Sequence, residues 1–192
     1  AFTQCKNLID KIGGKISTQK DLTKISIDGA GIMGRPGIAS SLFQILSDSG
    51  INIRLIATSE VKVSCVINSS SGEKALRNIG DFFKLNDKQI SINPISENNN
   101  EPEVRGVALD RDQIQFSVKN VPDKPGTASS ICSTLAEKNI SLDTIVQSER
   151  KHQDKTKDIS FTLKKNDRNE AKYALEELIS NWKGAKLEEG NS

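Results

Sequence analysis

Apolar and polar residues alternate along Lys24–Asp28 and along Val61–Ile67, which predicts two strands that each bury one face. Between these segments, the apolar residues of positions 38–46 recur at i, i+3 and i+4, the spacing of an amphipathic helix with one buried side. Proline suits the first turn of a helix, so this helix is predicted to begin near Pro36.

Three further segments complete this structural unit. A strand is expected around Ile51–Ile56, a second helix carries the apolar residues of positions 75–83, and a last strand is expected at Gln89–Ile92. The resulting order, βαββαβ, is that of the ferredoxin-like fold. The sequence therefore predicts an α+β architecture, in which an antiparallel sheet carries both helices on one face.

The chain matches itself when it is shifted by 89 residues. Pro36-Gly37 then lies over Pro125-Gly126, and ten of the 25 positions from Pro36 to Glu60 are identical. Such self-similarity indicates two copies of one unit. The second copy is expected to hold strands at Gln113–Val118, Thr144–Val146 and Ile159–Leu163, a helix that begins at Pro125, and a helix over the apolar positions 171–182.

The segments outside the two copies predict the domain boundaries. Ser96–Glu103 is entirely polar and is predicted to be a linker, with a further strand at Val104–Leu109. Leu8–Ile16 resembles Leu178–Leu187, so the start is interpreted as the helix and strand that end a preceding repeat. The chain is read as a piece of a longer array, with a tail at 1–20, a domain at 21–95, the linker at 96–103 and a domain at 104–188.

One insertion distinguishes the second copy from the first. It adds about seven residues within the run Glu149–Asp158, which is all polar and is predicted to be a solvated hairpin tip. His152, the only histidine, lies in this run and is interpreted as a surface residue rather than a catalyst.

Composition narrows the possible partners. The 27 basic and 25 acidic side chains nearly balance, and no basic stripe is interleaved with aromatics, so nucleic acid is not an expected partner. No apolar run is long enough to span a membrane, and the first residues lack the apolar run of a signal peptide. Three widely spaced cysteines are typical of reduced thiols in the cytoplasm, with Cys65 and Cys132 expected in the core.

Gly29-Ala30-Gly31-Ile32-Met33-Gly34 has the G-x-G-x-x-G spacing of a dinucleotide-binding turn. The only acidic residue at the expected distance is Asp48, which lies inside the first predicted helix. The second copy has Asn120-Val121-Pro122-Asp123 in place of the glycines while keeping the Pro-Gly pair. The shared fold therefore requires the Pro-Gly turn rather than the three glycines. A dinucleotide-binding oxidoreductase that uses Gly29–Gly34 remains an alternative hypothesis.

Other motifs of catalysis or metal binding are absent from the sequence, so binding is the chemistry to consider. Each Pro-Gly turn leaves unpaired N–H groups at the start of a helix, which suits a carboxylate. An amino acid would also need an anion for its ammonium, and Asp123 and Asp143 are candidates, with Asn52 as a polar neighbour. For Asp123, a helix cap or turn residue is an equally good interpretation.

Several strings resemble the ACT domains in the regulatory region of aspartate kinases. In the first copy this resemblance is carried by Thr58-Ser59-Glu60-Val61-Lys62-Val63-Ser64. In the second it is carried by Val104-Arg105-Gly106-Val107-Ala108-Leu109-Asp110 with Val121-Pro122-Asp123-Lys124-Pro125-Gly126. The two kinds of string occur in the reverse of the order found in two-repeat members, which implies the centre of a four-repeat enzyme.

The resemblance implies feedback regulation of a kinase domain that is not in this chain. Lysine or threonine would bind to the ACT domains and inhibit the phosphorylation of aspartate, for which the kinase domain would use ATP and magnesium. The fragment itself would have no catalytic residue, metal or cofactor. A homodimer formed by ACT–ACT pairing is implied, in the cytoplasm, or in the plastid of a plant or alga.

The resemblance also implies which positions contact the effector. In the second copy these are Asp123, Pro125, Gly126, Thr127, Ala128, Asp143 and Gln147, and in the first copy Arg35, Gly37, Ile38, Ala39, Asn52, Thr58 and Ser59. Two positions depart from the family pattern, because Ser141 replaces an asparagine and Gly34 stands where the second copy has Asp123. A pocket between the copies is one expectation, and a purely architectural dimerisation repeat is another.

Overall fold

The computed structural model describes residues 5, 9, 11–14, 18–29, 32, 35–59, 61–87, 89–92, 109–148 and 156–190. The first repeat contains β1 (Leu22–Asp28), α2 (Ile38–Asp48), β2 (Leu55–Ser59), β3 (Lys62–Asn68), the 3₁₀ turn η1 (Ser69–Ser71) and α3 (Gly72–Phe83). The second contains β4 (Gln113–Pro122), α4 (Thr127–Glu137), β5 (Ile145–Ser148), β6 (Thr156–Lys164), η2 (Lys165–Asp167), α5 (Arg168–Ile179) and β7 (Lys186–Glu189).

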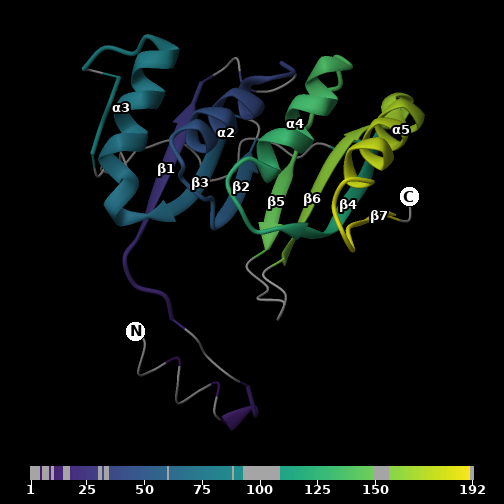
Figure 1. The fold of residues 1–192 in the computed structure, drawn as a ribbon, viewed down its shortest axis with the longest axis horizontal. Coiled ribbons are helices and arrows are strands. Elements are labelled where there is room, and N and C mark those ends of the chain that lie inside the picture. The colour runs from purple at the N-terminus through teal and green to yellow at the C-terminus, as the bar shows by residue number, and fades with distance from the viewer. Residues whose placement is uncertain are drawn as a thin grey trace.

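The seven strands in the described part of the chain belong to one sheet that runs across both repeats. Their order is β1-β3-β2-β5-β6-β4-β7, as Figure 1 shows, and every pairing is antiparallel. The prediction of tandem ferredoxin-like units with antiparallel sheets is therefore confirmed. A dinucleotide-binding fold needs parallel strands, so this sheet excludes that use of Gly29–Gly34.

The two repeats join through the edge strands β2 and β5. Ala57 pairs with Val146, its equivalent at the 89-residue offset, and Ile56 pairs with Gln147. This register relates the two repeats by an approximate two-fold axis, here called the pseudo-dyad, which passes through the pair Ala57–Val146. Equivalent residues of the two repeats therefore lie on opposite sides of this axis.

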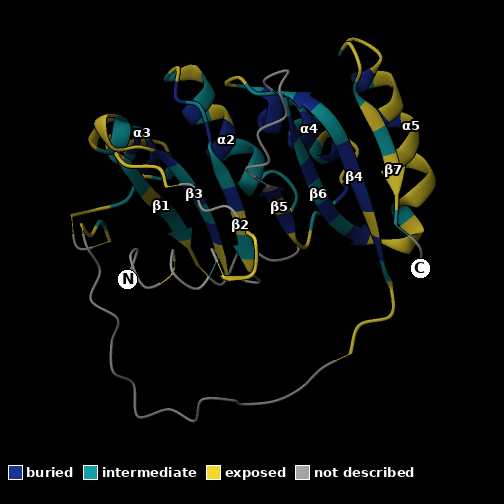
Figure 2. Ribbon diagram, turned by 90° about the horizontal axis from the view of Figure 1, so that it is seen from below, coloured by how far each residue is buried: buried dark blue, intermediate teal, exposed yellow. Residues whose placement is uncertain are grey.

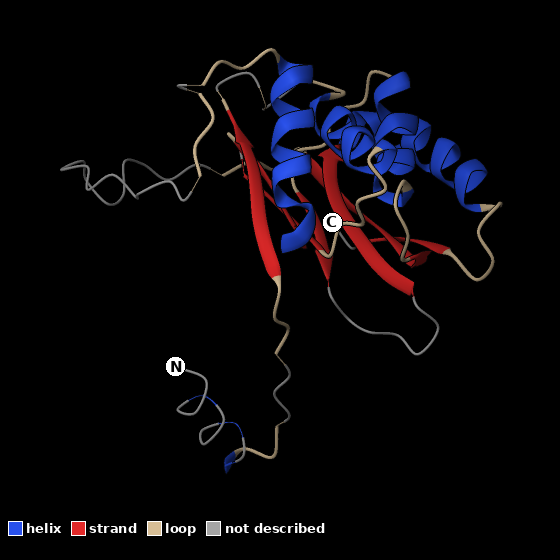
Figure 3. Cartoon of the chain, turned by 60° about the vertical axis from the view of Figure 1, so that its left-hand side comes forward, coloured by secondary structure: helices blue, strands red, loops and turns tan. Residues whose placement is uncertain are grey.

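The four described helices lie on one face of the sheet, as Figure 3 shows, and the core fills the space between the two layers. Every second residue of β6 is buried, from Lys157 to Leu163, as expected for a strand with one covered face. In Figure 2, β4 is largely buried whereas β1 is largely intermediate, and in β1 only Ile25 is buried. The outer strand of the first repeat is thus less covered than its equivalent.

Helices α2 and α4 pack beside each other across the pseudo-dyad. The Ser40 and Ser133 hydroxyls lie 2.6 Å apart, and the Ser129 hydroxyl donates to Gln44 Oε1 at 2.6 Å. Ser40 and Ser129 are equivalent residues, and so are Gln44 and Ser133, so these two contacts are symmetry mates. The serines that both copies keep therefore hold the two repeats together.

Both Pro-Gly turns use glycine for its backbone conformation. Gly37 (φ 98°) and Gly126 (φ 94°) lie in the left-handed region that side chains disfavour, and each is the N-cap of its helix. The helices consequently begin at Ile38 and Thr127, two residues after the prolines that were predicted to start them. The glycine in each pair is what the turn requires.

The strand predicted at Gln89–Ile92 is wrong. The Gln89 N–H donates to Asn86 O at 2.8 Å, which turns the chain, and residues 89–92 are irregular. The side chain of Ile90 packs against Gly80 of α3, where an added Cβ would lie 2.9 Å from its Cδ1 atom. Because Gly80 has no side chain, α3 offers Ile90 an apolar site that competes with strand pairing.

Of the polar run Glu149–Asp158, which was predicted to be a solvated hairpin tip, residues 149–155 lie outside the described residues. Its last three residues extend β6, and Lys157 among them is 7% exposed. Cys65 and Cys132 are free and buried as expected, and burial raises the pKa of both thiols to about 12, with the neighbouring Cys132 adding to the effect on Cys65. Both thiols are thus protonated core residues.

Several predictions fall largely outside the described residues. They concern His152, the linker 96–103, and the strand Val104–Leu109, of which only Leu109 is described and is irregular. In the tail at 1–20, the described residues Cys5, Ile9 and Lys11 are helical, while the expected strand at its end is not described. None of the helices in the described part has the length and apolar character required to cross a membrane.

Candidate functional site

Two pockets lie between the repeats, and the pseudo-dyad relates them. Each combines the Pro-Gly turn and helix start of one repeat with the entry to the junction strand of the other. The Asp123 pocket is lined by Phe43, Ile51, Asn52, Ile53, Val121, Pro122, Asp123, Lys124, Pro125, Gly126, Thr127, Ala128, Ser129, Gln147, Lys157 and Ile159. The Arg35 pocket is lined by Ile32, Arg35, Pro36, Gly37, Ala39, Ser40, Thr58, Ser59, Val63, Cys132, Ile140, Leu142, Asp143 and Ile145.

The structure brings the expected contact residues together, but two of them change sides. Asn52, from the first repeat, lies in the Asp123 pocket, and Asp143, from the second repeat, lies in the Arg35 pocket. Ile38, the first residue of α2, lines neither pocket. The remaining expected positions line the pocket of their own repeat, so the arrangement between copies matches the sequence expectation.

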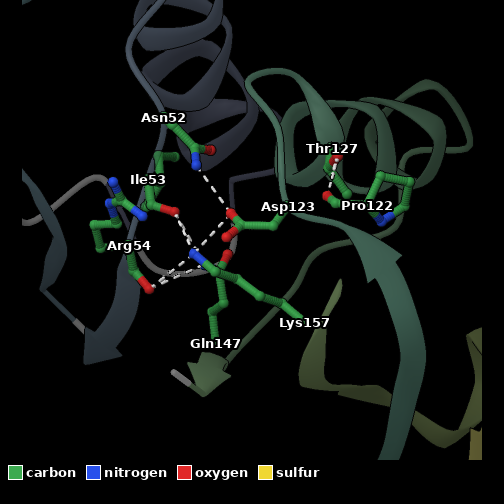
Figure 4. A network of polar contacts seen from close by, with 8 residues as sticks. All are labelled: Asn52, Ile53, Arg54, Pro122, Asp123, Thr127, Gln147 and Lys157. Atoms are coloured by element: carbon green, nitrogen blue, oxygen red, sulfur yellow. Dashed lines mark hydrogen bonds and ion pairs between the residues drawn. The ribbon is translucent and has the colours of Figure 1, made fainter. Parts of the chain in front are cut away.

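The Asp123 pocket contains a dense polar network, drawn in Figure 4. Asp123 Oδ1 accepts hydrogen bonds from Asn52 Nδ2 at 2.9 Å and from Lys157 Nζ at 2.9 Å. The helix-cap interpretation of Asp123 is wrong, because Gly126 is the N-cap of α4 and that helix has no side-chain cap bond. Asp123 instead links its own repeat to the strand entry of the first.

Two buried side chains complete this network. Lys157 Nζ donates to the carbonyl oxygens of Ile53 at 3.0 Å and Arg54 at 3.2 Å. Gln147 Nε2 donates to the same two oxygens, at 3.1 Å and 3.2 Å. The entry to β2 therefore receives both donors of the second repeat on its backbone rather than on its side chains.

The electrostatics of Asp123 follow from these contacts. Burial raises the pKa of its carboxyl group, but the hydrogen bonds from Asn52 and Lys157, with the positive charges of Lys157 and Arg54, outweigh burial and lower the pKa overall. The carboxylate is consequently charged at neutral pH and paired with a buried ammonium.

The Arg35 pocket is wider, and its charged groups have no partner among the described residues. It encloses about 520 Å³ between its atoms, against about 340 Å³ in the Asp123 pocket, with open solvent included in both. Within the described part of the chain, neither the Arg35 guanidinium nor the Asp143 carboxylate makes a hydrogen bond or ion pair. Thr58 Oγ1 accepts a hydrogen bond from the N–H of Ile145 at 2.7 Å, and this bond joins the two repeats in the lining of the Arg35 pocket.

Lys157 is the site residue that sequence reasoning missed. It lies in a run of polar residues, so composition indicated a solvated loop. The signal that could have found it is the alternation of β6, because Lys157, Ile159, Phe161 and Leu163 occupy every second position and share one face. No group of three or more potential metal ligands occurs among the described residues.

Comparisons with known proteins agree with this geometry. Residues 25–83 and residues 116–181 each match a model of the ACT domain. Aspartokinase 2 of Bacillus subtilis (strain 168) is 39% identical over 71 residues, which are 37% of this chain and 17% of that protein. An aspartokinase of Thermus thermophilus is 37% identical over 85 residues, which are 44% of this chain and 21% of that protein.

A solved structure matches most of the chain. The crystal structure of aspartate kinase from Synechocystis superposes with a TM-score of 0.83 at 40% identity, over 92% of this chain and 30% of that one. The chain therefore belongs to the ACT-domain family, as two ACT domains in tandem. Within that family it is a tandem-ACT regulatory region of the aspartokinase type, and it spans about a fifth of the length of the curated aspartokinases that it matches.

Proposed function

We propose that this chain is the amino-acid-sensing part of an aspartate kinase, and that lysine or threonine binds between its two ACT domains. The observation that carries the proposal is the Arg35 pocket. There a cation from the first repeat and a carboxylate from the second line one cavity without partners among the described residues. An amino acid carries one charge of each sign, so it complements this pair.

The pocket supplies a contact for each part of such a ligand. The α-carboxylate would meet Arg35 and the free N–H groups at the start of α2, where the helix dipole favours an anion. The α-ammonium would meet Asp143. The ligand side chain would then face Thr58 and Ser59, whose hydroxyls can bind a threonine hydroxyl or a lysine ammonium.

Because both repeats contribute to the pocket, a bound amino acid would favour one arrangement of the repeats over others. Such a shift of populations is the basis of feedback inhibition in this proposal. The target would be an attached kinase domain that transfers a phosphoryl group from ATP, with magnesium, to L-aspartate and yields 4-phospho-L-aspartate. Pairing of ACT domains between two chains would give a homodimer.

Isothermal titration calorimetry of the 192-residue chain with lysine, threonine and leucine tests this function. Lysine or threonine should bind and leucine should not. Asp143→Asn should weaken binding about tenfold or more, since it removes one charged contact. Glu137→Gln, at the exposed end of α4, is the matched control and should leave the affinity unchanged. Absence of heat with both amino acids at millimolar concentration, from a folded chain, would contradict the proposal.

A further inference from the structure

Lys157 occupies a position that a free ligand could take. Its side chain leaves β6, is 7% exposed, and ends between the two repeats (Figure 4). An ammonium group has three N–H donors, and Lys157 Nζ has three acceptors within 3.2 Å: Asp123 Oδ1, Ile53 O and Arg54 O. The pocket thus coordinates a primary ammonium completely.

The three oxygens that coordinate Lys157 have almost no capacity left for a second ammonium. A carbonyl oxygen has two lone pairs, and both Ile53 O and Arg54 O already receive Lys157 and Gln147. Asp123 Oδ1 likewise receives two donors, Asn52 and Lys157. Among the described acceptors of this network, Asp123 Oδ2 and the amide oxygens of Asn52 and Gln147 have no donor.

We propose that the Asp123 pocket is a primary-ammonium site that the chain fills with its own Lys157. The occupant is tethered, so the pocket is closed to free amines unless Lys157 is removed. This closure leaves the Arg35 pocket as the open one of the pair. If the proposed function holds, one amino acid therefore binds per chain.

The equivalent position in the first repeat shows why the two pockets differ. Cys65 pairs with Ile56 and Phe161 pairs with Ile145, so Val61 is the equivalent of Lys157. Valine has no donor, and the Arg35 pocket accordingly has no ammonium of its own. This valine, one residue before β3, is one of the differences that separate the filled pocket from the open one.

Chemical rescue of Lys157→Ala tests this proposal. The substitution removes three carbons and the nitrogen beyond Cβ, which together correspond to propylammonium. At ten times its dissociation constant, propylammonium should raise the Tm of Lys157→Ala by about 3 °C. The wild-type chain and Lys164→Ala, an exposed lysine of the same strand, should show no such shift.

Tetramethylammonium, which has the same charge and no N–H donor, controls for ionic strength and should stabilise none of the proteins. Equal shifts with both cations, or no shift in a folded Lys157→Ala, would overturn the proposal. This readout uses no amino acid, so its failure is distinct from a failure of the proposed function.

Nitrogen-15 NMR of the lysine ammonium groups gives a second measurement that does not depend on a variant of reduced stability. A buried, fully hydrogen-bonded ammonium exchanges slowly, so the wild-type chain should show a Lys157 resonance that is missing from Lys157→Arg. This resonance should stay unchanged when lysine or threonine is added at millimolar concentration. Its loss or displacement by either amino acid would show that the pocket opens, and would refute the closure.

Discussion

The Asp123 pocket and the Arg35 pocket share one backbone frame but place their charges in opposite senses. In the Asp123 pocket the carboxylate stands on the turn, and the strand entry of the other repeat carries Arg54. In the Arg35 pocket the turn carries the cation, and Asp143, at the position equivalent to Arg54, supplies the carboxylate. The shared backbone arrangement determines where each Pro-Gly turn meets the strand entry of the other repeat. The charged side chains determine whether a side chain of the protein or a ligand fills the pocket.

Removal of the cation from the filled pocket should produce the largest effect on this comparison. Lys157→Met keeps most of the side-chain volume but leaves Asp123 without its cation and two carbonyl oxygens with one donor fewer. The free energy of unfolding should fall by about 2–4 kcal/mol, since breaking a buried ion pair from one side is costly. Urea denaturation followed by circular dichroism measures this change.

Lys164→Met, which alters an exposed lysine on the same strand, is the control and should stay within about 0.5 kcal/mol of the wild type. Equal stabilities of the two variants would show that the pair at Asp123 contributes nothing.

The two Pro-Gly turns allow a finer comparison. Gly37→Ala and Gly126→Ala both force a side chain into the left-handed region, at a cost of about 1–3 kcal/mol each. A Cβ at Gly126 would also lie 3.1 Å from Ser47 Oγ at the end of α2, whereas a Cβ at Gly37 meets no atom of the described residues within 4 Å. Gly126→Ala should therefore be the less stable variant in thermal unfolding, and the reverse order would contradict the close approach of the repeats at that turn.

The smallest expected effect is a dependence on pH. The folded pKa of Asp123 is lowered, so the carboxylate stabilises the fold above the unfolded value of about 3.9, and this contribution disappears as pH falls through the folded pKa. The difference in unfolding free energy between the wild type and Asp123→Asn should shrink as pH is lowered from 6 to 3. Urea denaturation at each pH measures it.

Other lowered carboxyl pKa values, such as that of Glu189 beside Arg168, are common to both proteins and cancel in this difference. A difference that stays constant over the whole range would mean that Asp123 does not titrate as its contacts require.

Much of this molecule was visible in the sequence because short-range patterns encode it. The 89-residue offset predicted two equivalent units, and the Pro-Gly pairs marked the two turns that form the pockets. The sequence departed from the structure where long-range contacts decide. Gln89–Ile92 has the composition of a strand, but Ile90 finds an apolar site on α3 at Gly80.

Lys157 illustrates the other limit of sequence reasoning. Its neighbours are polar, and local composition contains no sign of the two carbonyl oxygens more than a hundred residues earlier that coordinate it. The pairing of β2 with β5 is equally long-range, because the sequence of an edge strand does not identify the strand with which it pairs. Residues such as Asn52 and Asp143 could therefore be listed as candidates but not assigned to a pocket.

The junction strands have a mechanical consequence. At its start, β2 is preceded by Asn52 and Ile53 in the Asp123 pocket, and near its end it presents Thr58 and Ser59 to the Arg35 pocket. The antiparallel β5 runs in the opposite direction, with Asp143 before its start in the Arg35 pocket and Gln147 in the Asp123 pocket. Each strand therefore connects the two pockets. A shift of the strand along its own axis would move residues further into one pocket and out of the other.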